Sequence, residues 1–392
     1  MDDKNETRIN ASDALSWLDE AFDKVAAQIS QSTLTGEQTT DRIPDKRNRL
    51  QAFKSQLETN EVEVDEDGEN EPSAHLLAHL IDVLVKFGQG TALCLVFEGE
   101  GREGRIITHL LDAGLVAGPI FEDVSGAILM SGTLDPPNMF ADLLGIKPNK
   151  RGESVHPSPF LSNRRPVIIA NDVTTLYRER SPQNTENMKT HIAELIKNTE
   201  GNVAVFTPSY RILSEIFDDF FIPKINKKIE ARDWTKQDIS ALMVDLEDSQ
   251  KFGRKILLGG VFNGKLSEGI DYSGGVLDAV VCVGIPNPPP SVFQTAFADY
   301  IKEKFGRQNF WRYANSQPAI NSILQAMGRP IRAIGDRALI LLLDKRHLDR
   351  TYSICFPNNL MMSQVSNPEA TARYAKRFFS KVQREPESES FN

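Results

Sequence analysis

Short apolar runs alternate with helical patterns from about residue 150 to residue 343, and this alternation constrains the fold more than any other feature. Strands are predicted at 166–170, 202–206, 255–258, 279–283 and 338–343, with helices at 185–198, 212–220 and 235–247. The basic, polar stretch around Lys227 is predicted to be less regular. Strands that are apolar on both faces and separated by helices are typical of a parallel sheet covered on both sides. The sequence therefore predicts an α/β lobe.

The part of the chain before residue 150 is patterned differently. Helices are predicted at 11–30, 46–58 and 73–87, and apolar strands at 91–97 and 124–130. The first strand is followed by Gly99-Glu-Gly101-Arg-Glu-Gly104 and a possible helix, which fits the letters of the dinucleotide-binding fingerprint. A nucleotide-cofactor enzyme therefore stays an alternative, although Glu100 and Glu103 would crowd carboxylates against a pyrophosphate.

Charge and cysteine usage narrow the class of protein. The net charge is −9, but residues 58–71 carry eight acids and no base, which leaves the rest of the chain nearly neutral and able to carry basic surfaces. The three cysteines fit neither a disulfide framework nor a metal site, which favours a reducing cytoplasm. The sequence shows no apolar run of about eighteen residues and no secretion signal, so we expect neither a membrane span nor export.

Two stretches have features of phosphate-binding sites. Arg329 and Arg332 lie three residues apart behind an apolar helix pattern, and guanidinium matches phosphate oxygens bidentately. An isolated pair of this kind is usually only a solvated helix face. Residues 259–265 have the spacing of a phosphate-binding P-loop, but Leu266 stands where Ser or Thr must hold magnesium. With no other such motif in the sequence, we expect no complete ATP site.

Five motifs follow one another in a recognisable order: Ser131-Gly-Thr-Leu134, Thr207-Pro-Ser-Tyr210, Gly264-Lys-Leu-Ser-Glu-Gly-Ile-Asp-Tyr272, Gly284-Ile-Pro-Asn-Pro288 and Gln325-Ala-Met-Gly-Arg-Pro-Ile-Arg332. They resemble the late helicase motifs of the XPD/DinG branch of superfamily 2, archaeal XPD-type DNA helicases in particular, over roughly residues 88–384. The resemblance implies a RecA-like (P-loop NTPase-type) second motor lobe that follows a helical N-terminal segment.

The resemblance also implies domain boundaries. Residues 1–87 resemble the end of the family's helical Arch insertion, and 88–147 resemble the closing segment of the first motor lobe. Residues 148–384 then form the second lobe, and 385–392 a disordered tail.

Roles for individual residues come from the same resemblance. Arg329 and Arg332 are expected to act on the γ-phosphate of ATP, with Gln325 beside them. Gly264, Glu268, Gly269 and Asp271 are expected to couple nucleotide state to DNA position. Single-stranded DNA contacts are expected from Thr133, Ser209, Tyr210, Arg164, Arg165, Arg178 and Arg180.

The function implied is that of the C-terminal motor portion of an ATP-dependent 5′-to-3′ DNA helicase acting in repair. The family's P-loop, DEAH-type box and four iron–sulfur cysteines are not found in the sequence. ATP with Mg²⁺ is therefore expected to be bound mainly by a first lobe supplied elsewhere or lost, and an iron–sulfur cluster is not expected. The expected partners are single-stranded DNA, that lobe and repair proteins, without a membrane. The alternative is a catalytically silent DNA- or partner-binding module.

Overall fold

The computed structural model describes residues 6–20, 50–51, 54–55, 73–99, 104–268, 270–272 and 274–380. The chain divides into two compact units. Unit 1 comprises Met1–Ala127, Ala141–Arg151 and Pro289–Phe310, and unit 2 comprises Ile128–Phe140, Gly152–Pro288 and Trp311–Asn392. These units interleave along the sequence, and the domain boundaries expected above stay a prediction.

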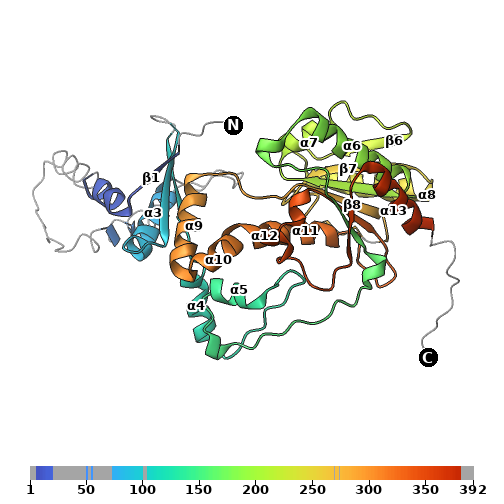
Figure 1. Cartoon of the computed structure of the whole chain (residues 1–392). Coiled ribbons are helices and arrows are strands. Elements are labelled where there is room, and N and C mark those ends of the chain that lie inside the picture. The colour runs from blue at the N-terminus through green and yellow to red at the C-terminus, as the bar shows by residue number, and fades with distance from the viewer. Residues whose placement is uncertain are drawn as a thin grey trace, which may run out of the picture. The chain divides into compact units, whose positions relative to one another are not determined.

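Unit 2 is built on a seven-stranded sheet in the order β10-β4-β9-β8-β5-β7-β6, in which every pairing is parallel (Figure 1). Its strands are β4 (Val167–Ala170), β5 (Asn202–Thr207), β6 (Ile225–Ile229), β7 (Lys255–Val261), β8 (Leu277–Val283), β9 (Leu339–Leu343) and β10 (Met362–Val365). The central strands β5 and β9 are buried throughout, and β8 is buried at every position except Asp278, because helices cover both faces of the sheet.

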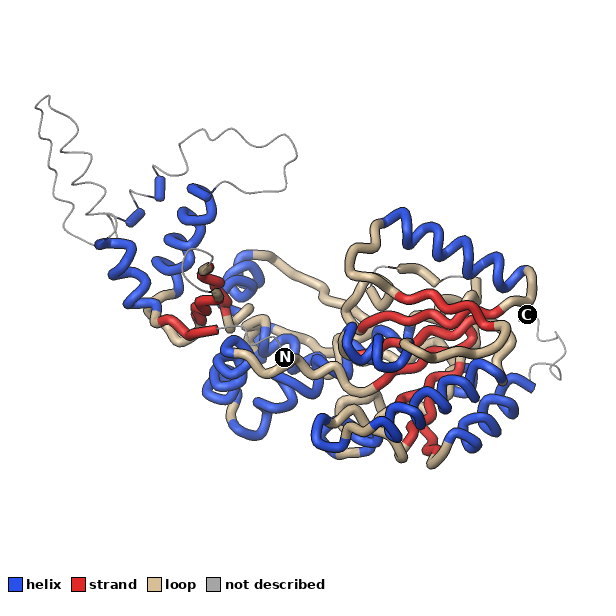
Figure 2. Tube along the Cα trace, turned by 90° about the horizontal axis from the view of Figure 1, so that it is seen from above, coloured by secondary structure: helices blue, strands red, loops and turns tan. Residues whose placement is uncertain are grey.

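The helices of unit 2 are α6 (Pro182–Lys197), α7 (Tyr210–Phe217), α8 (Lys236–Lys251), α11 (Gln317–Gly328), α12 (Arg350–Ser353) and α13 (Pro368–Ser380). Residues of α8, α11 and α12 share one buried cluster with one face of the sheet, and residues of α6, α7 and α13 share another with the opposite face. Figure 2 shows the strands as a layer between helices. The predicted α/β fold is confirmed.

The parallel pairing gives the sheet two chemically distinct edges. We call the edge where the strands end the carboxyl edge; it carries residues 171–180, 208–211, 230–232, 262–265, 284–287 and 344–347. The opposite, amino edge carries residues 162–166, 252–254, 274–276 and 332–338. A helix that connects two parallel strands runs back along the sheet, so α11, between β8 and β9, ends towards the amino edge.

Unit 1 contains a three-stranded antiparallel sheet, β1-β2-β3, formed by β1 (Glu6–Ile9), β2 (Leu93–Glu98) and β3 (Arg105–Leu110). Its helices are α3 (Ser73–Phe87), α4 (Gly114–Asp123) and α9 (Val292–Phe305), while α5 (Pro137–Leu143) and α10 (Arg307–Trp311) extend across the unit boundaries. Asp112 ends the hairpin and is 6% exposed. It accepts hydrogen bonds from Tyr300 Oη and Lys304 Nζ of α9, both at 2.7 Å.

This hairpin corrects the interpretation of Gly99–Gly104 as a dinucleotide site. The residues after Gly104 form β3, which returns antiparallel to β2, rather than the predicted helix. In the described residues β2 is followed by a strand and not by a helix, so the strand-to-helix turn that holds a pyrophosphate in the dinucleotide-binding fold is not formed. The cofactor-enzyme alternative is therefore dropped.

Two further predictions about elements are wrong. Residues 124–130 form no strand, and Ile128 and Met130 are each 87% exposed. An apolar run becomes a strand only beside another strand, and none of the described strands pairs with it. The basic stretch around Lys227 was expected to be irregular but forms β6, whose polar alternation fits an edge strand.

Several predictions fall wholly or partly outside the described residues. These are the helix 11–30 beyond residue 20, most of the helix 46–58, the acidic stretch 58–71, Gly269 and the tail. Residues 11–20 and the helix 73–87 are helical as predicted. Among the described helices, none has the length and apolar character needed to cross a membrane.

Candidate nucleotide and nucleic-acid sites

The loop from residue 262 to residue 276 runs from the carboxyl edge back to the start of β8 and meets the arginines that follow α11. Arg329 Nη1 donates a hydrogen bond to the Ile270 carbonyl oxygen at 3.0 Å. Arg332 Nε lies 3.1 Å from Asp271 Oδ1. Arg329 and Ile270 are 59 residues apart in the sequence, so only the fold brings them together. The loop therefore links the two edges of the sheet.

The two guanidiniums are differently buried. Arg329 is half-buried, and its Nε is a buried donor without a hydrogen-bond partner among the described residues. Burial, and then the charge of Arg332, lower the pKa of Arg329. The side chains of Arg332 and Asp271 are 40% and 70% exposed, so their ion pair is weak. Gln325, which precedes Arg329 in the sequence, and Glu268, which precedes Asp271, are both exposed. The guanidinium of Arg332 is thus accessible to an anion, whereas the unpartnered Nε of Arg329 is buried.

The P-loop-like turn at 259–265 is filled by the protein's own carboxylate. Glu230, 3% exposed, accepts hydrogen bonds from Val261 N at 3.1 Å and from Lys265 N at 2.8 Å. A Cβ at Gly260 or Gly264 would lie 2.8 or 2.7 Å from the carboxylate oxygens, so both glycines make room for Glu230. The carboxylate occupies the position where a P-loop holds phosphate, and the turn does not fit a nucleotide.

The turn after β5 is also tied to Glu230. Ser209 caps α7 by accepting a hydrogen bond from Ile212 N at 3.3 Å. Tyr210 Oη donates to Glu230 Oε1 at 3.3 Å, and the Arg232 guanidinium lies 4.6 Å from the ring centroid. Burial, followed by the charge of Glu230, raises the pKa of Tyr210. The ring is half-buried and lies under Arg232, and the DNA contact expected of Tyr210 stays a prediction.

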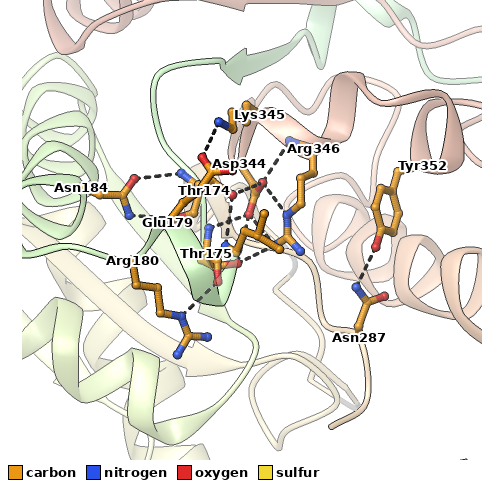
Figure 3. Close-up of polar contacts among 11 residues, drawn as sticks. Thr174, Thr175, Glu179, Arg180, Asn184, Asn287, Asp344, Lys345, Arg346 and Tyr352 are labelled. Carbon is orange, nitrogen blue, oxygen red and sulfur yellow. Dashed lines mark hydrogen bonds and ion pairs between the residues drawn. The ribbon is translucent and has the colours of Figure 1, made fainter. Parts of the chain in front are cut away.

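A buried network that the sequence did not reveal joins the ends of β4 and β9 (Figure 3). Asp344, with no exposed surface, accepts hydrogen bonds from the backbone N–H of Thr175 at 2.8 Å and from the hydroxyls of Thr174 and Thr175 at 3.0 Å. Arg346 donates to the same carboxylate through Nη2 at 2.7 Å and Nε at 3.0 Å. Burial by itself would raise the pKa of Asp344, but these donors outweigh it and the pKa is lowered.

Comparisons with known proteins bear on the family that this fold resembles. Residues 192–363 match the helicase C-terminal domain family. The chain is 32% identical over 225 residues to the ATP-dependent DNA helicase XPD of Sulfolobus acidocaldarius, covering 56% of this chain and 39% of that protein. The chain is similar to the XPD-type superfamily 2 helicases. The part matched is the C-terminal part of these XPD-type proteins.

Further relatives extend the comparison. The chain is 27% identical over 256 residues to the general transcription and DNA repair factor IIH helicase subunit XPD/RAD3 of Saccharomyces cerevisiae, covering 60% of this chain and 32% of that protein. A solved apo XPD structure has the same fold, with a TM-score of 0.54 and 23% identity, over 82% of this chain and 70% of that one. The chain thus spans well under half the length of the curated XPD relatives that it matches.

The XPD-type motif residues occupy both edges of the sheet. Arg178 and Arg180 follow β4 at the carboxyl edge, on the same edge as Ser209. Arg164 and Arg165 precede β4 instead, where Arg164 Nη1 donates to the Gly335 carbonyl oxygen at 2.8 Å. The four arginines expected to lie together are therefore split between the edges. The Arg164 side chain lies beside the turn between Arg332 and β9.

Two remaining expectations concern Thr133 and metals. Thr133 is half-buried in a short turn, where its hydroxyl lies 3.2 Å from that of Ser131, and it does not end a strand. In the described ranges, no three acidic, histidine or cysteine side chains are grouped as a metal site would need. The residues that would hold Mg²⁺ with ATP are not identified in this chain.

Proposed function

We propose that the chain is the C-terminal motor portion of an XPD-type ATP-dependent DNA helicase. It would supply arginine fingers to an ATP molecule held mainly by a first lobe, and it would grip single-stranded DNA with its own carboxyl edge. The 5′-to-3′ polarity and the role in DNA repair are part of the proposal and rest on the similarity to XPD proteins.

The observation that carries the proposal is the meeting of Arg329 and Arg332 with the loop that contains Ile270 and Asp271. An arginine finger works only when lobe closure brings it to the γ-phosphate, so it must remain accessible in the open state. The partly exposed guanidiniums meet this condition. Lys265 N of the same loop donates a hydrogen bond to Glu230, which also accepts one from Tyr210, so these bonds connect the loop to the carboxyl edge.

The chain's own residues would bind and orient rather than cleave. Arg329 and Arg332 would neutralise charge developing on the transferring phosphoryl group, and Gln325 would contribute a hydrogen bond beside them. Gly264, Glu268, Gly269 and Asp271 would transmit nucleotide state along the loop. Ser209, with Arg178 and Arg180, would contact DNA phosphates at the carboxyl edge.

The alternative is a catalytically silent DNA- or partner-binding module. It is favoured by the carboxylate of Glu230 in the P-loop-like turn, because this turn cannot serve as a nucleotide site of its own. The two proposals agree on DNA binding and differ in whether Arg329 ever meets a triphosphate.

The test uses the purified chain with fluorescein-labelled oligo(dT) and a mixed-sequence oligonucleotide at about 50 mM and about 200 mM salt. We expect similar affinity for both sequences, steep weakening by salt and no ATP turnover by the chain alone. Adding a P-loop-bearing first lobe, for example that of the Sulfolobus relative, is expected to give DNA-stimulated hydrolysis. DNA binding without any such stimulation would favour the silent module.

A further inference from the structure

Tyr177 stands out at the carboxyl edge because its ring is exposed in a basic setting. It begins a short 3-10 turn, Tyr177–Glu179, and its side chain is 75% exposed. Arg178 and Arg180 are both exposed beside it. A single exposed aromatic residue is common, so exposure alone assigns no role.

The second observation is the way in which the ring is supported. The Arg180 guanidinium lies 5.6 Å from the centroid of the Tyr177 ring, within cation–π range. Arg180 Nε donates to the Thr175 carbonyl oxygen at 3.1 Å, and Thr175 is held by the buried Asp344 (Figure 3). The arginine that lies over the ring is thus anchored to the core of the sheet.

The charges around the ring favour an anionic ligand. Glu179, the one acid of the turn, is paired with Lys345 at 2.5 Å. The turn follows β4 at the carboxyl edge, the same edge at which Ser209 is proposed to contact a phosphate.

We propose that Tyr177 is a stacking platform for a base of single-stranded DNA, with Arg178 and Arg180 contacting the flanking phosphates. This inference rests on the proposed function and moves the aromatic contact from Tyr210 to Tyr177. Stacking on an exposed ring beside arginines is how proteins bind single strands without reading sequence. The exposed arginines beside the ring would neutralise the phosphates that flank a stacked base.

The chain offers a matched control on the opposite edge. Phe252 is 69% exposed, and the Arg254 guanidinium lies 5.2 Å from its ring centroid. This pair precedes β7 and so lies at the amino edge. It has the same chemistry as Tyr177 with Arg180 but lacks the proposed position in the DNA path.

The experiment measures oligo(dT) affinity by fluorescence anisotropy for the wild-type chain, Tyr177→Ala, Tyr177→Phe and Phe252→Ala. Tyr177→Ala is expected to weaken binding about tenfold or more, while Tyr177→Phe and Phe252→Ala remain within about twofold of the wild type. The salt slope is expected to stay unchanged in Tyr177→Ala. In Arg178→Ala or Arg180→Ala it is expected to fall by about 0.7 for each phosphate that the variant no longer neutralises.

A second readout distinguishes stacking from a loss of folding. Tyr177→Trp is expected to show tryptophan fluorescence quenched by added oligo(dT), and Phe252→Trp is expected to show no added quenching. If the wild type binds DNA, but Tyr177→Ala binds equally well and Tyr177→Trp is not quenched, the ring does not stack on a base and this inference fails alone. If the wild-type chain does not bind DNA, the proposed function fails with it.

Discussion

The two edges of the seven-stranded sheet hold their charged groups in opposite ways. At the carboxyl edge, Asp344 and Glu230 are 0% and 3% exposed. Both carboxylates accept hydrogen bonds from backbone N–H groups, and Asp344 also accepts one from the Arg346 side chain. At the amino edge, the pair of Arg332 and Asp271 is largely exposed, and Arg329 keeps a donor unused. Asp344 and Glu230 are thus fixed by buried partners, whereas Arg332 is left able to change its partner.

This difference follows from what each edge is proposed to do. A surface that grips a nucleic acid gains affinity when its shape is set before binding, because little ordering remains to be done. An arginine finger must leave its resting partner when the lobes close, so a weak, exposed pair costs little to break. The comparison predicts that substitutions at the amino edge mainly lower ATP hydrolysis. Substitutions at the carboxyl edge are predicted mainly to lower the free energy of unfolding.

The largest expected effect concerns Arg329. In a mixture of this chain with a P-loop-bearing first lobe, Arg329→Ala is expected to lower DNA-stimulated ATP hydrolysis by about three to five decades, because the developing phosphoryl charge loses its cation. The measurement is the steady-state release of phosphate with saturating oligo(dT). DNA affinity of the variant is measured in parallel and is expected to match that of the wild type. Equal losses in both assays would remove the proposed separation between the edges.

The next effect concerns stability at the carboxyl edge. Asp344→Ala leaves Arg346, whose side chain is 15% exposed, without its carboxylate, and it removes the acceptor of both threonines. Breaking a buried ion pair in this way is expected to lower the free energy of unfolding by about 3–5 kcal/mol. Urea unfolding followed by circular dichroism measures the change. A decrease of less than about 1 kcal/mol would show that the network is not a structural anchor.

Whether a structural feature could be predicted from the sequence depends on how far apart in the sequence its interacting residues lie. The alternation of strands and helices predicted the sheet because each element carries its own local pattern. Asp344 and Thr175 are 169 residues apart, and neither has a pattern that indicates the other. The only available signal for Asp344 was an acid directly after an apolar strand. Glu230 was hidden for a related reason, since the edge strand before it looked like a basic loop.

The pH dependence of stability gives a third, smaller effect at the same edge. Burial lowers the pKa of His347 to about 4, partly opposed by the charge of Asp344. An unfolded chain binds this proton below about pH 6.5 while the folded chain does not, so stability falls as the pH falls from about 6.5 towards 4, by about 3 kcal/mol in all. Comparing urea midpoints at about pH 7 and about pH 5 measures most of this decrease.

The matched variants isolate the histidine. His347→Phe is expected to show a shallower decline between these two pH values, because the buried group that resists protonation is gone. Replacing the exposed His156, which contacts only Ser154 in the hydrogen bonds of the described chain, is expected to leave the decline of the wild type in place. A His347→Phe variant that loses stability with acid as steeply as the wild type would assign the decline to other groups.

The smallest expected effect returns to the amino edge. Asp271→Ala removes the exposed partner of Arg332, and screened surface pairs contribute only about 0–1 kcal/mol to stability. The urea midpoint is therefore expected to move very little, in contrast to that of Asp344→Ala. A decrease as large as that of Asp344→Ala would mean that the Arg332 pair is a structural lock. Separating Arg332 from Asp271 on lobe closure would then cost too much free energy. The contrast between the two edges would no longer explain why one is proposed to bind DNA and the other to act on ATP.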